Sequence, residues 1–226
     1  MIRFKPLKFL ILLLPVMFIC SSCGEDFALT TKYNYLEDET KTWNIPDSLN
    51  NTSFEMVDNN GISLIFNDLY TITSFSTGRS GFLFVPVSKS QTENIYISSQ
   101  SNYGLNFSIY LYASFDDFGD YLNMNLGDTN FSYDFKYKEL SSVGIKDAYI
   151  SRIVTDEGLE GEKIFSKVEI VENYSIGDKK YAQVLHFKLN DFENKINIFT
   201  ITDIYYAKQV GLVQYNYANG VFVYRK

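Results

Sequence analysis

The sequence predicts an all-β fold, an antiparallel meander that forms a curved half-barrel, a barrel or a sandwich, with at most one short helix. Beyond Pro46, hydrophobic residues alternate with period two almost throughout, which is the pattern of strands that bury one face. The chain contains 18 Tyr and 19 Phe, residue types that favour strands. Turn-forming steps such as Asn60-Gly61 and Asn219-Gly220 separate the runs. Such a meander must close on itself or cover one face, because an open sheet exposes edges and apolar surface.

The alternation places the strands in order along the chain. The predicted strands cover residues 54–57, 62–75, 81–87, 94–99, 105–115, 131–137, 148–154, 163–171, 181–189, 196–206, 210–217 and 221–224. Only residues 114–124 (SFDDFGDYLNM) have a helical pattern, with Ser114 as the cap and Phe115, Phe118, Tyr121 and Leu122 on one face.

Composition limits the class of protein. The chain has 226 residues, of which 46% are hydrophobic and 21% charged, which is typical of one packed domain. Its formal net charge is −7, and it has no basic patch that could neutralise phosphates. We therefore expect no nucleic-acid partner.

The pattern of the N-terminus indicates an export signal. Residues 1–22 combine basic residues (Arg3, Lys5 and Lys8), an apolar run over 9–19, and small residues at Ser21 and Ser22. The apolar run is shorter than the roughly 20 residues that a spanning helix needs. We therefore expect a signal peptide and not a membrane anchor.

The run Ile19-Cys20-Ser21-Ser22-Cys23 resembles the lipobox of bacterial lipoprotein signals. The resemblance implies cleavage before Cys23 and covalent lipid on its sulfur and new amino group. Several acyl chains anchor a protein stably, because each buried CH₂ contributes about 0.8 kcal/mol. The expected organisation is a signal peptide over 1–22, a lipidated N-terminus and tether over 23–45, and a β domain over 46–226.

Two further motifs concern location. Gly24-Glu25-Asp26 is similar to the acidic export signal of Bacteroidota-type surface lipoproteins, and loss of Arg3, Lys5 and Lys8 would change the net charge from −7 to −10. The resemblance implies outer-membrane anchoring, with either outward display or a periplasmic orientation. Asp47-Ser48-Leu49 matches the O-glycosylation sequon of that bacterial group, so Ser48 is a candidate modification site.

The C-terminal third resembles envelope lipoproteins with curved antiparallel sheets. The segment 205–213 (YYAKQVGLV) is similar to their final hairpin, with Lys208 in place of the usual Pro, and 161–170 (GEKIFSKVEI) is similar to an upstream strand. Some members of that group hold lipids in the concave face, which implies an apolar-ligand cavity as an alternative here.

Few residues are suited to catalysis or metal binding. After processing, the chain keeps no free Cys and one His, His186, which we expect to be half-exposed beside Lys188. Acidic groups at Asp116, Asp117 and Asp120, or at Asp156 and Glu157, could hold Ca²⁺ but are expected to be solvated loop charges. Cys23 is therefore the only site residue that we assign, and we expect no catalytic residue, cofactor or metal.

These observations favour a lipid-anchored, non-catalytic binding or assembly module with an unknown protein or glycan partner. A carrier of an apolar ligand in a concave sheet is the alternative, and a carboxylate-based glycoside hydrolase is the third hypothesis. A dry apolar cavity would favour the carrier, whereas a filled interior with an aromatic exterior would favour the module. Two converging buried carboxylates with perturbed pKa would favour the hydrolase.

Overall fold

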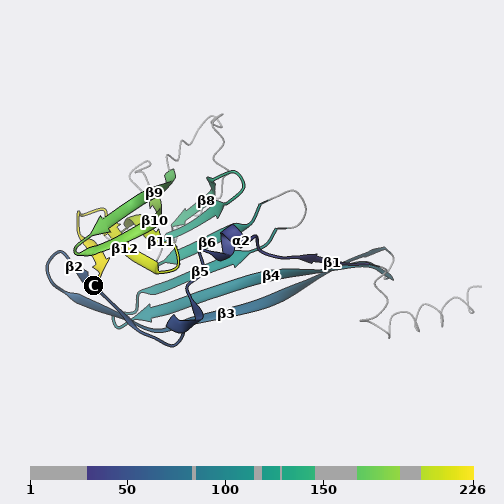
Figure 1. The fold of residues 1–226 in the computed structure, drawn as a ribbon, viewed down its shortest axis with the longest axis horizontal. Coiled ribbons are helices and arrows are strands. Elements are labelled where there is room, and N and C mark those ends of the chain that lie inside the picture. Colours follow the sequence, from purple (N-terminus) through teal and green to yellow (C-terminus); the bar gives the residue numbers. More distant parts are fainter. Residues whose placement is uncertain (1–29, 83–84, 115–118, 128, 146–166, 189–199) are drawn as a thin grey trace, which may run out of the picture. The chain divides into compact units, whose positions relative to one another are not determined.

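A computed structural model describes residues 30–82, 85–114, 119–127, 129–145, 167–188 and 200–226 (Figure 1). The chain divides into two compact units: the smaller contains residues up to Asn34 together with Phe75–Thr92, and the larger contains Tyr35–Ser74 and Glu93–Lys226. Helical structure in the described residues is limited to α2 (Asp38–Lys41) and one 3-10 turn, Asp47–Leu49. The strands are β1 (Thr30–Asn34), β2 (Phe54–Asp58), β3 (Ser63–Phe82), β4 (Val85–Ser101), β5 (Asn106–Tyr112), β6 (Tyr121–Leu126), β7 (Thr129–Asp134), β8 (Glu139–Ile145), β9 (Lys167–Ile176), β10 (Lys179–Lys188), β11 (Ile201–Ala207), β12 (Gly211–Tyr217) and β13 (Phe222–Arg225).

The predicted all-β antiparallel fold is confirmed. Twelve of the thirteen described strands follow the order β8-β7-β6-β5-β4-β3-β2-β13-β12-β11-β10-β9. Two meanders thus meet where β13 pairs antiparallel with β2, with Tyr224 opposite Val57. The end strands β8 and β9 also lie close together, so the sheet of the larger unit forms a nearly closed barrel (Figure 1). Of the three alternatives that periodicity left open, the structure selects the barrel.

Strict alternation fills the barrel interior. The burial of β5 and of β6 changes at every residue, with Phe107, Ile109 and Leu111 facing inward on β5 and Leu122 and Met124 on β6. These residues belong to one core cluster with side chains from β2, β10, β11 and β12. Burial of such apolar area is the main stabilising contribution to the fold.

Strands that are not neighbours in the sheet also contact each other across this interior. Phe131 of β7 and Phe187 of β10 have ring centroids 5.4 Å apart, and Tyr133 meets Phe187 edge-on at 6.2 Å. The Thr129 hydroxyl, also on β7, donates a hydrogen bond to the Ile201 carbonyl of β11 at 3.4 Å. The centre of the barrel is therefore occupied by side chains.

Part of the segment that we expected to be a tether lies in the core. Leu36, Trp43 and Ile45 are at most 2% exposed, and the Tyr206 hydroxyl donates to the Trp43 carbonyl at 2.8 Å. Gly211 has a φ of +97°, and a Cβ there would lie 2.7 Å from Ile45 Cδ1, so this close approach requires glycine.

Two buried carboxylates hold the beginning of this segment. Glu93 accepts the Leu36 amide and pairs with Lys41, both at 3.0 Å. Asp120 accepts the Glu37 amide at 2.7 Å. Asp120, which we expected to be a solvated loop charge, is thus 5% exposed and serves as a backbone acceptor.

The helix predicted over 114–124 is wrong where the structure describes it. Residues 121–126 form β6, in which Tyr121 and Asn123 face outward while Leu122 and Met124 face inward. A short run of alternating residues also satisfies part of a helical spacing, and pairing with β5 and β7 decides for the strand. Phe115 and Phe118 lie outside the described residues.

In the smaller unit, β1 pairs in parallel with β4, with Thr30 opposite Ser88 and Asn34 opposite Thr92. Because the strands are parallel, the chain enters β1 from the end at which β4 begins. The tether therefore contributes a strand that periodicity had not indicated.

Candidate functional site

The outer surface of β4–β7 forms a face made of tyrosines and small polar residues. Twelve outward-facing residues define this tyrosine face: Tyr96, Ser98, Gln100, Asn106, Ser108, Tyr110, Tyr112, Tyr121, Asn123, Asn125, Asn130 and Ser132. None of the twelve is charged, and the carboxylate that follows them on β7, Asp134 opposite Tyr121, is buried. A solvent-facing sheet surface ordinarily carries many Lys and Glu side chains. Tyr, Ser and Asn are instead the types enriched in antibody binding surfaces, where Tyr contributes contact area at low entropic cost.

Cross-strand register aligns the four tyrosines. Tyr96 lies opposite Tyr110, and Tyr112 lies opposite Tyr121. Successive ring centroids are 6.5 Å apart for Tyr96 and Tyr110, 5.6 Å for Tyr110 and Tyr112, and 5.1 Å for Tyr112 and Tyr121. Such cross-strand aromatic pairs stabilise the sheet and hold the rings in place.

The environment keeps the more buried hydroxyls of this row protonated. Burial raises the pKa of Tyr121 to about 12, and the charge of Asp134 and a hydrogen bond to it act in the same direction. Burial also raises the pKa of Tyr112. At neutral pH these hydroxyls are therefore uncharged, and the charge that adjoins them is that of Asp134, which is 3% exposed.

Hydrogen bonds between strands order the amides of the face. The Asn125 amide donates to the Ser108 hydroxyl at 3.3 Å, and the Asn130 amide donates to Asn125 Oδ1. A polar network of this kind fixes side-chain positions before any ligand arrives.

A polar hollow of about 620 Å³ lies at one edge of the tyrosine face, between β3, β4 and β5. A β-bulge in β3 opens it: Asn67 and Asp68 both face solvent, whereas Phe66 before them and Leu69 after them are fully buried. Asp68 has a φ of +49°, which Asp tolerates better than most residues. Tyr96, the most exposed ring of the row, lies at the hollow.

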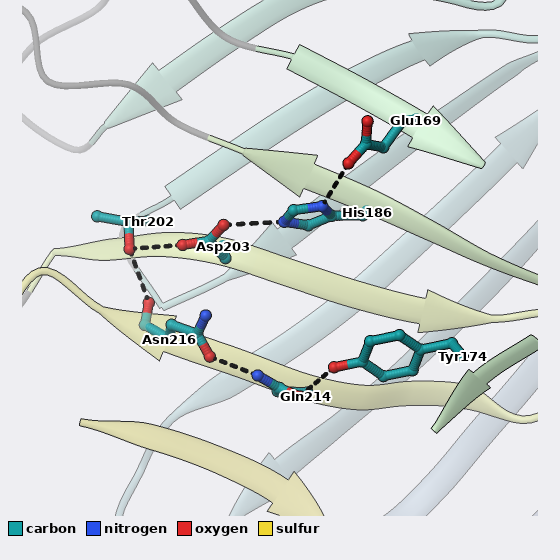
Figure 2. A network of polar contacts seen from close by, with 7 residues as sticks. All are labelled: Glu169, Tyr174, His186, Thr202, Asp203, Gln214 and Asn216. Carbon is teal, nitrogen blue, oxygen red and sulfur yellow. Dashed lines mark hydrogen bonds and ion pairs between the residues drawn. The ribbon is translucent and has the colours of Figure 1, made fainter. Parts of the chain in front are cut away.

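A second polar cluster lies on the outer surface of β9–β12 and centres on His186 (Figure 2). His186 Nδ1 is 3.2 Å from Glu169 Oε1, and His186 Nε2 is 2.8 Å from Asp203 Oδ1. The imidazole also stacks on Tyr205, with centroids 4.1 Å apart and planes inclined by 6°. His186 faces outward as expected, but its side chain is 12% exposed, which is less than the predicted half-exposure, and both ring nitrogens contact carboxylates.

The chain of contacts continues across the sheet. The Thr202 hydroxyl donates to Asp203 Oδ2 at 3.0 Å, and the Gln214 amide donates to Asn216 Oδ1 at 2.7 Å (Figure 2). The Tyr174 hydroxyl donates to Gln214 Oε1. The cluster thus links β9, β10, β11 and β12 side chain to side chain.

The geometry of this cluster differs from that of a nucleophilic triad. In a triad a hydroxyl touches the imidazole, which removes its proton. Here Asp203 stands between the Thr202 hydroxyl and His186, and the other ring nitrogen faces a second carboxylate. The imidazole lies between two carboxylates, one at each ring nitrogen, so the arrangement is suited to holding strands together.

The protonation state of Asp203 decides whether it could act as a general acid. Burial by itself would raise the pKa of Asp203, but hydrogen bonds from His186 and Thr202 outweigh it and hold the pKa below its usual range. A general acid for glycoside hydrolysis needs a raised pKa instead. Asp203 is therefore a permanent anion at neutral pH.

Most of the other predicted site residues lie outside the described part of the chain. Ser48 is exposed in the 3-10 turn. Cys23, Asp116, Asp117, Asp156 and Glu157 lie outside the described residues. Within the part of the chain that the structure describes, no group of three or more His, Cys, Asp or Glu side chains is arranged to hold a metal ion. Among these same residues, no helix is long and apolar enough to cross a membrane.

Comparison with known protein families, curated proteins and solved structures finds nothing that matches this chain.

Sequence reasoning identified outward Tyr and Asn as candidate contacts but missed the hollow and the His186 cluster. The alternation in 94–100, 106–112 and 121–125 already separates an uncharged outer set, and this signal could have found the tyrosine face. No local pattern indicates the bulge at Asn67-Asp68. The partners of His186 lie 17 residues away on either side along the chain, so only strand register brings them together.

Proposed function

We propose that this protein is a lipid-anchored lipoprotein of the outer membrane that acts as a non-catalytic binding module through its tyrosine face. The observation that carries the proposal is the contrast between the two sides of the sheet. The interior contains packed side chains, whereas the exposed and half-exposed residues of the tyrosine face are Tyr, Asn, Gln and Ser, with the buried Asp134 beside them. A filled interior favours a surface binder over a carrier with an internal ligand.

The short segment between Cys23 and β1 limits how far the β structure could lie from a lipid on Cys23. Six residues lie between Cys23 and Thr30, the first residue of β1, so seven Cα–Cα steps join the two. At about 3.3–3.6 Å per residue, they reach at most about 25 Å. A lipid on Cys23 would therefore hold β1, and the part of β4 paired with it, close to the bilayer surface.

A carboxylate-based hydrolase has less support. Glu169 and Asp203 do converge, but His186 lies between them and the pKa of Asp203 is lowered. The acidic surplus of the chain is instead consistent with a body that stays off an anionic membrane surface.

Metabolic labelling with radioactive palmitate tests the anchor. We expect label in the natural chain and its loss in Cys23→Ala, whereas Cys20→Ala should retain it. Equal label in the natural chain and in Cys23→Ala would contradict the anchor. Protease treatment of intact cells then distinguishes outward display, in which the body is cleaved, from a periplasmic orientation, in which it is protected.

Site-specific photo-cross-linking on intact cells tests the binding surface. A photoreactive residue replaces Tyr110 on the tyrosine face or, as the control, Gln183, a partly exposed residue of β10 outside that face. We expect adducts at position 110 and not at 183. Absence of adducts at 110, or equal adducts at both positions, would refute the role of the tyrosine face.

A further inference from the structure

We propose that the hollow beside Tyr96 binds one residue of an uncharged carbohydrate, with the Tyr96 ring stacked on the sugar and the surrounding amides bonded to its hydroxyls. This inference rests on the proposed binding role of the tyrosine face and names the ligand class of that surface. It concerns the hollow of about 620 Å³ between β3, β4 and β5, which lies within the size range of small-molecule sites.

The Tyr96 ring provides the apolar part of the site. It is 37% exposed, and its plane is tilted by 58° against Tyr110, so its neighbour does not stack over it. A sugar ring presents a face of C–H groups, and an exposed aromatic ring is a large and rigid partner for such a surface. Pairing with Tyr110 across the strands holds the Tyr96 backbone in position.

The polar lining matches hydroxyl groups. Three carboxamides, those of Asn67, Gln100 and Asn106, line the hollow together with four serines. A carboxamide both donates and accepts hydrogen bonds, as a sugar hydroxyl does. Gln100 and Asn106 lie opposite each other in the β4–β5 register, so two amides project side by side from a rigid sheet.

The lining has no cation to recognise an anion. Asp68 carries the only charged side chain among the lining residues, so a phosphate, a sulfate or a uronic acid would meet an uncompensated negative charge. A neutral sugar instead offers hydroxyl donors, and a carboxylate is a strong acceptor for them. The charge of the hollow thus selects an uncharged, hydroxyl-rich ligand.

A protein partner fits the hollow less well. Protein interfaces are organised around aromatic, apolar or Arg side chains that become fully desolvated at the centre of the contact. At the hollow, Tyr96 and Phe107 are the only large apolar groups among the lining residues, and Phe107 is buried in the core. Most of the surface that a protein would have to desolvate consists of hydroxyls, amides and one carboxylate.

Affinity electrophoresis of the full chain in mild detergent tests the proposal. The gels contain amylopectin, galactomannan, xyloglucan, dextran or, as the anionic control, polygalacturonate. We expect at least one neutral polysaccharide to retard the protein and polygalacturonate to leave its mobility unchanged. Retardation by polygalacturonate alone, or by none of the five polymers, would overturn the proposal.

Three variants separate stacking from a general effect on folding. Tyr96→Ala should weaken the association constant roughly tenfold or more, as expected for loss of a central aromatic contact. Tyr96→Phe keeps the ring and should stay within about threefold of the natural chain. Tyr103→Ala removes a ring that is 69% exposed and lies outside the hollow, so binding should not change. Retention of full binding by Tyr96→Ala would overturn the assignment.

Failure of the carbohydrate proposal can be distinguished from failure of the proposed binding function. Adducts at position 110 that contain protein and no carbohydrate, with no retardation by any neutral polysaccharide, would overturn the carbohydrate site and leave the tyrosine face as a binding surface. Equal palmitate label in the natural chain and in Cys23→Ala would overturn the anchor alone, because the gel assay does not depend on the lipid.

Discussion

Replacement of Phe187 by Ala tests whether the barrel interior is a packed core. Phe187 is fully buried, and its ring centroid is 5.4 Å from that of Phe131 and 6.2 Å from that of Tyr133, both on β7, which does not pair with β10. The variant loses the buried area of one ring, two aromatic contacts and the support of both walls. Substitutions of this kind cost about 3–5 kcal/mol, part of it for the cavity that remains.

Guanidinium chloride unfolding of the natural chain and of the variant measures this difference. We expect the denaturant concentration at the unfolding midpoint to fall, while the slope of the unfolding free energy against denaturant concentration stays the same. The melting temperature should fall by about 6–20 °C for a chain of this size. Tyr103→Ala is the matched control, because it also removes an aromatic ring but from an exposed position, and its free energy of unfolding should change by no more than about 0.5 kcal/mol.

The result also bears on function. If the free energy of unfolding of Phe187→Ala fell by less than about 1 kcal/mol, the interior would be loosely filled and the argument for a surface binder would fail. An internal carrier site would then regain support, because a cavity that already accommodates a ligand tolerates the loss of a ring.

Two further predictions concern the polar contacts of the larger unit. The pKa of Asp203 is lowered in the folded protein, so its contribution to stability is complete above the ordinary Asp pKa and disappears as pH falls through the folded value. Asp203→Asn should therefore reduce the dependence of the unfolding free energy on pH in the acid range. An unchanged acid profile would count against the His186 contact. Glu93→Ala leaves the Leu36 amide without its acceptor and should lower the free energy of unfolding by about 1–3 kcal/mol. Unfolding can be measured by the fluorescence of Trp43, which is buried in the folded protein, and Glu93→Gln should recover part of the loss. Equal stability of all three chains would contradict the attachment of this segment through Glu93.

Much of the fold follows from local sequence. The hairpin at Asp58–Gly61 is an example: Asn60-Gly61 predicts a tight turn, and Gly61 has a φ of +84° there. Period-two alternation likewise places Leu185 and Phe187 on the face opposite to His186, as the structure has them. Local patterns succeed here because the side-chain direction of a strand is a property of the backbone itself.

Other features depend on contacts between residues far apart in the chain. Trp43 joins the core because the Tyr206 hydroxyl, 163 residues later, donates a hydrogen bond to its carbonyl and Gly211 leaves room for Ile45. The strand at 121–126 has enough helical spacing to mislead a local prediction, and two neighbouring strands decide its conformation. His186 acquires its carboxylates only through the register of β9, β10 and β11.

The sequence by itself determined that this protein is an antiparallel β structure and which faces of its strands are apolar. The tertiary structure decided that the sheet curls into a nearly closed barrel, that its interior is filled, and that a bulge opens a polar hollow beside Tyr96. The physical reason is that alternation is set by the backbone residue by residue, whereas closure, register and cavities depend on which distant strands pair and how their side chains fill the space between them.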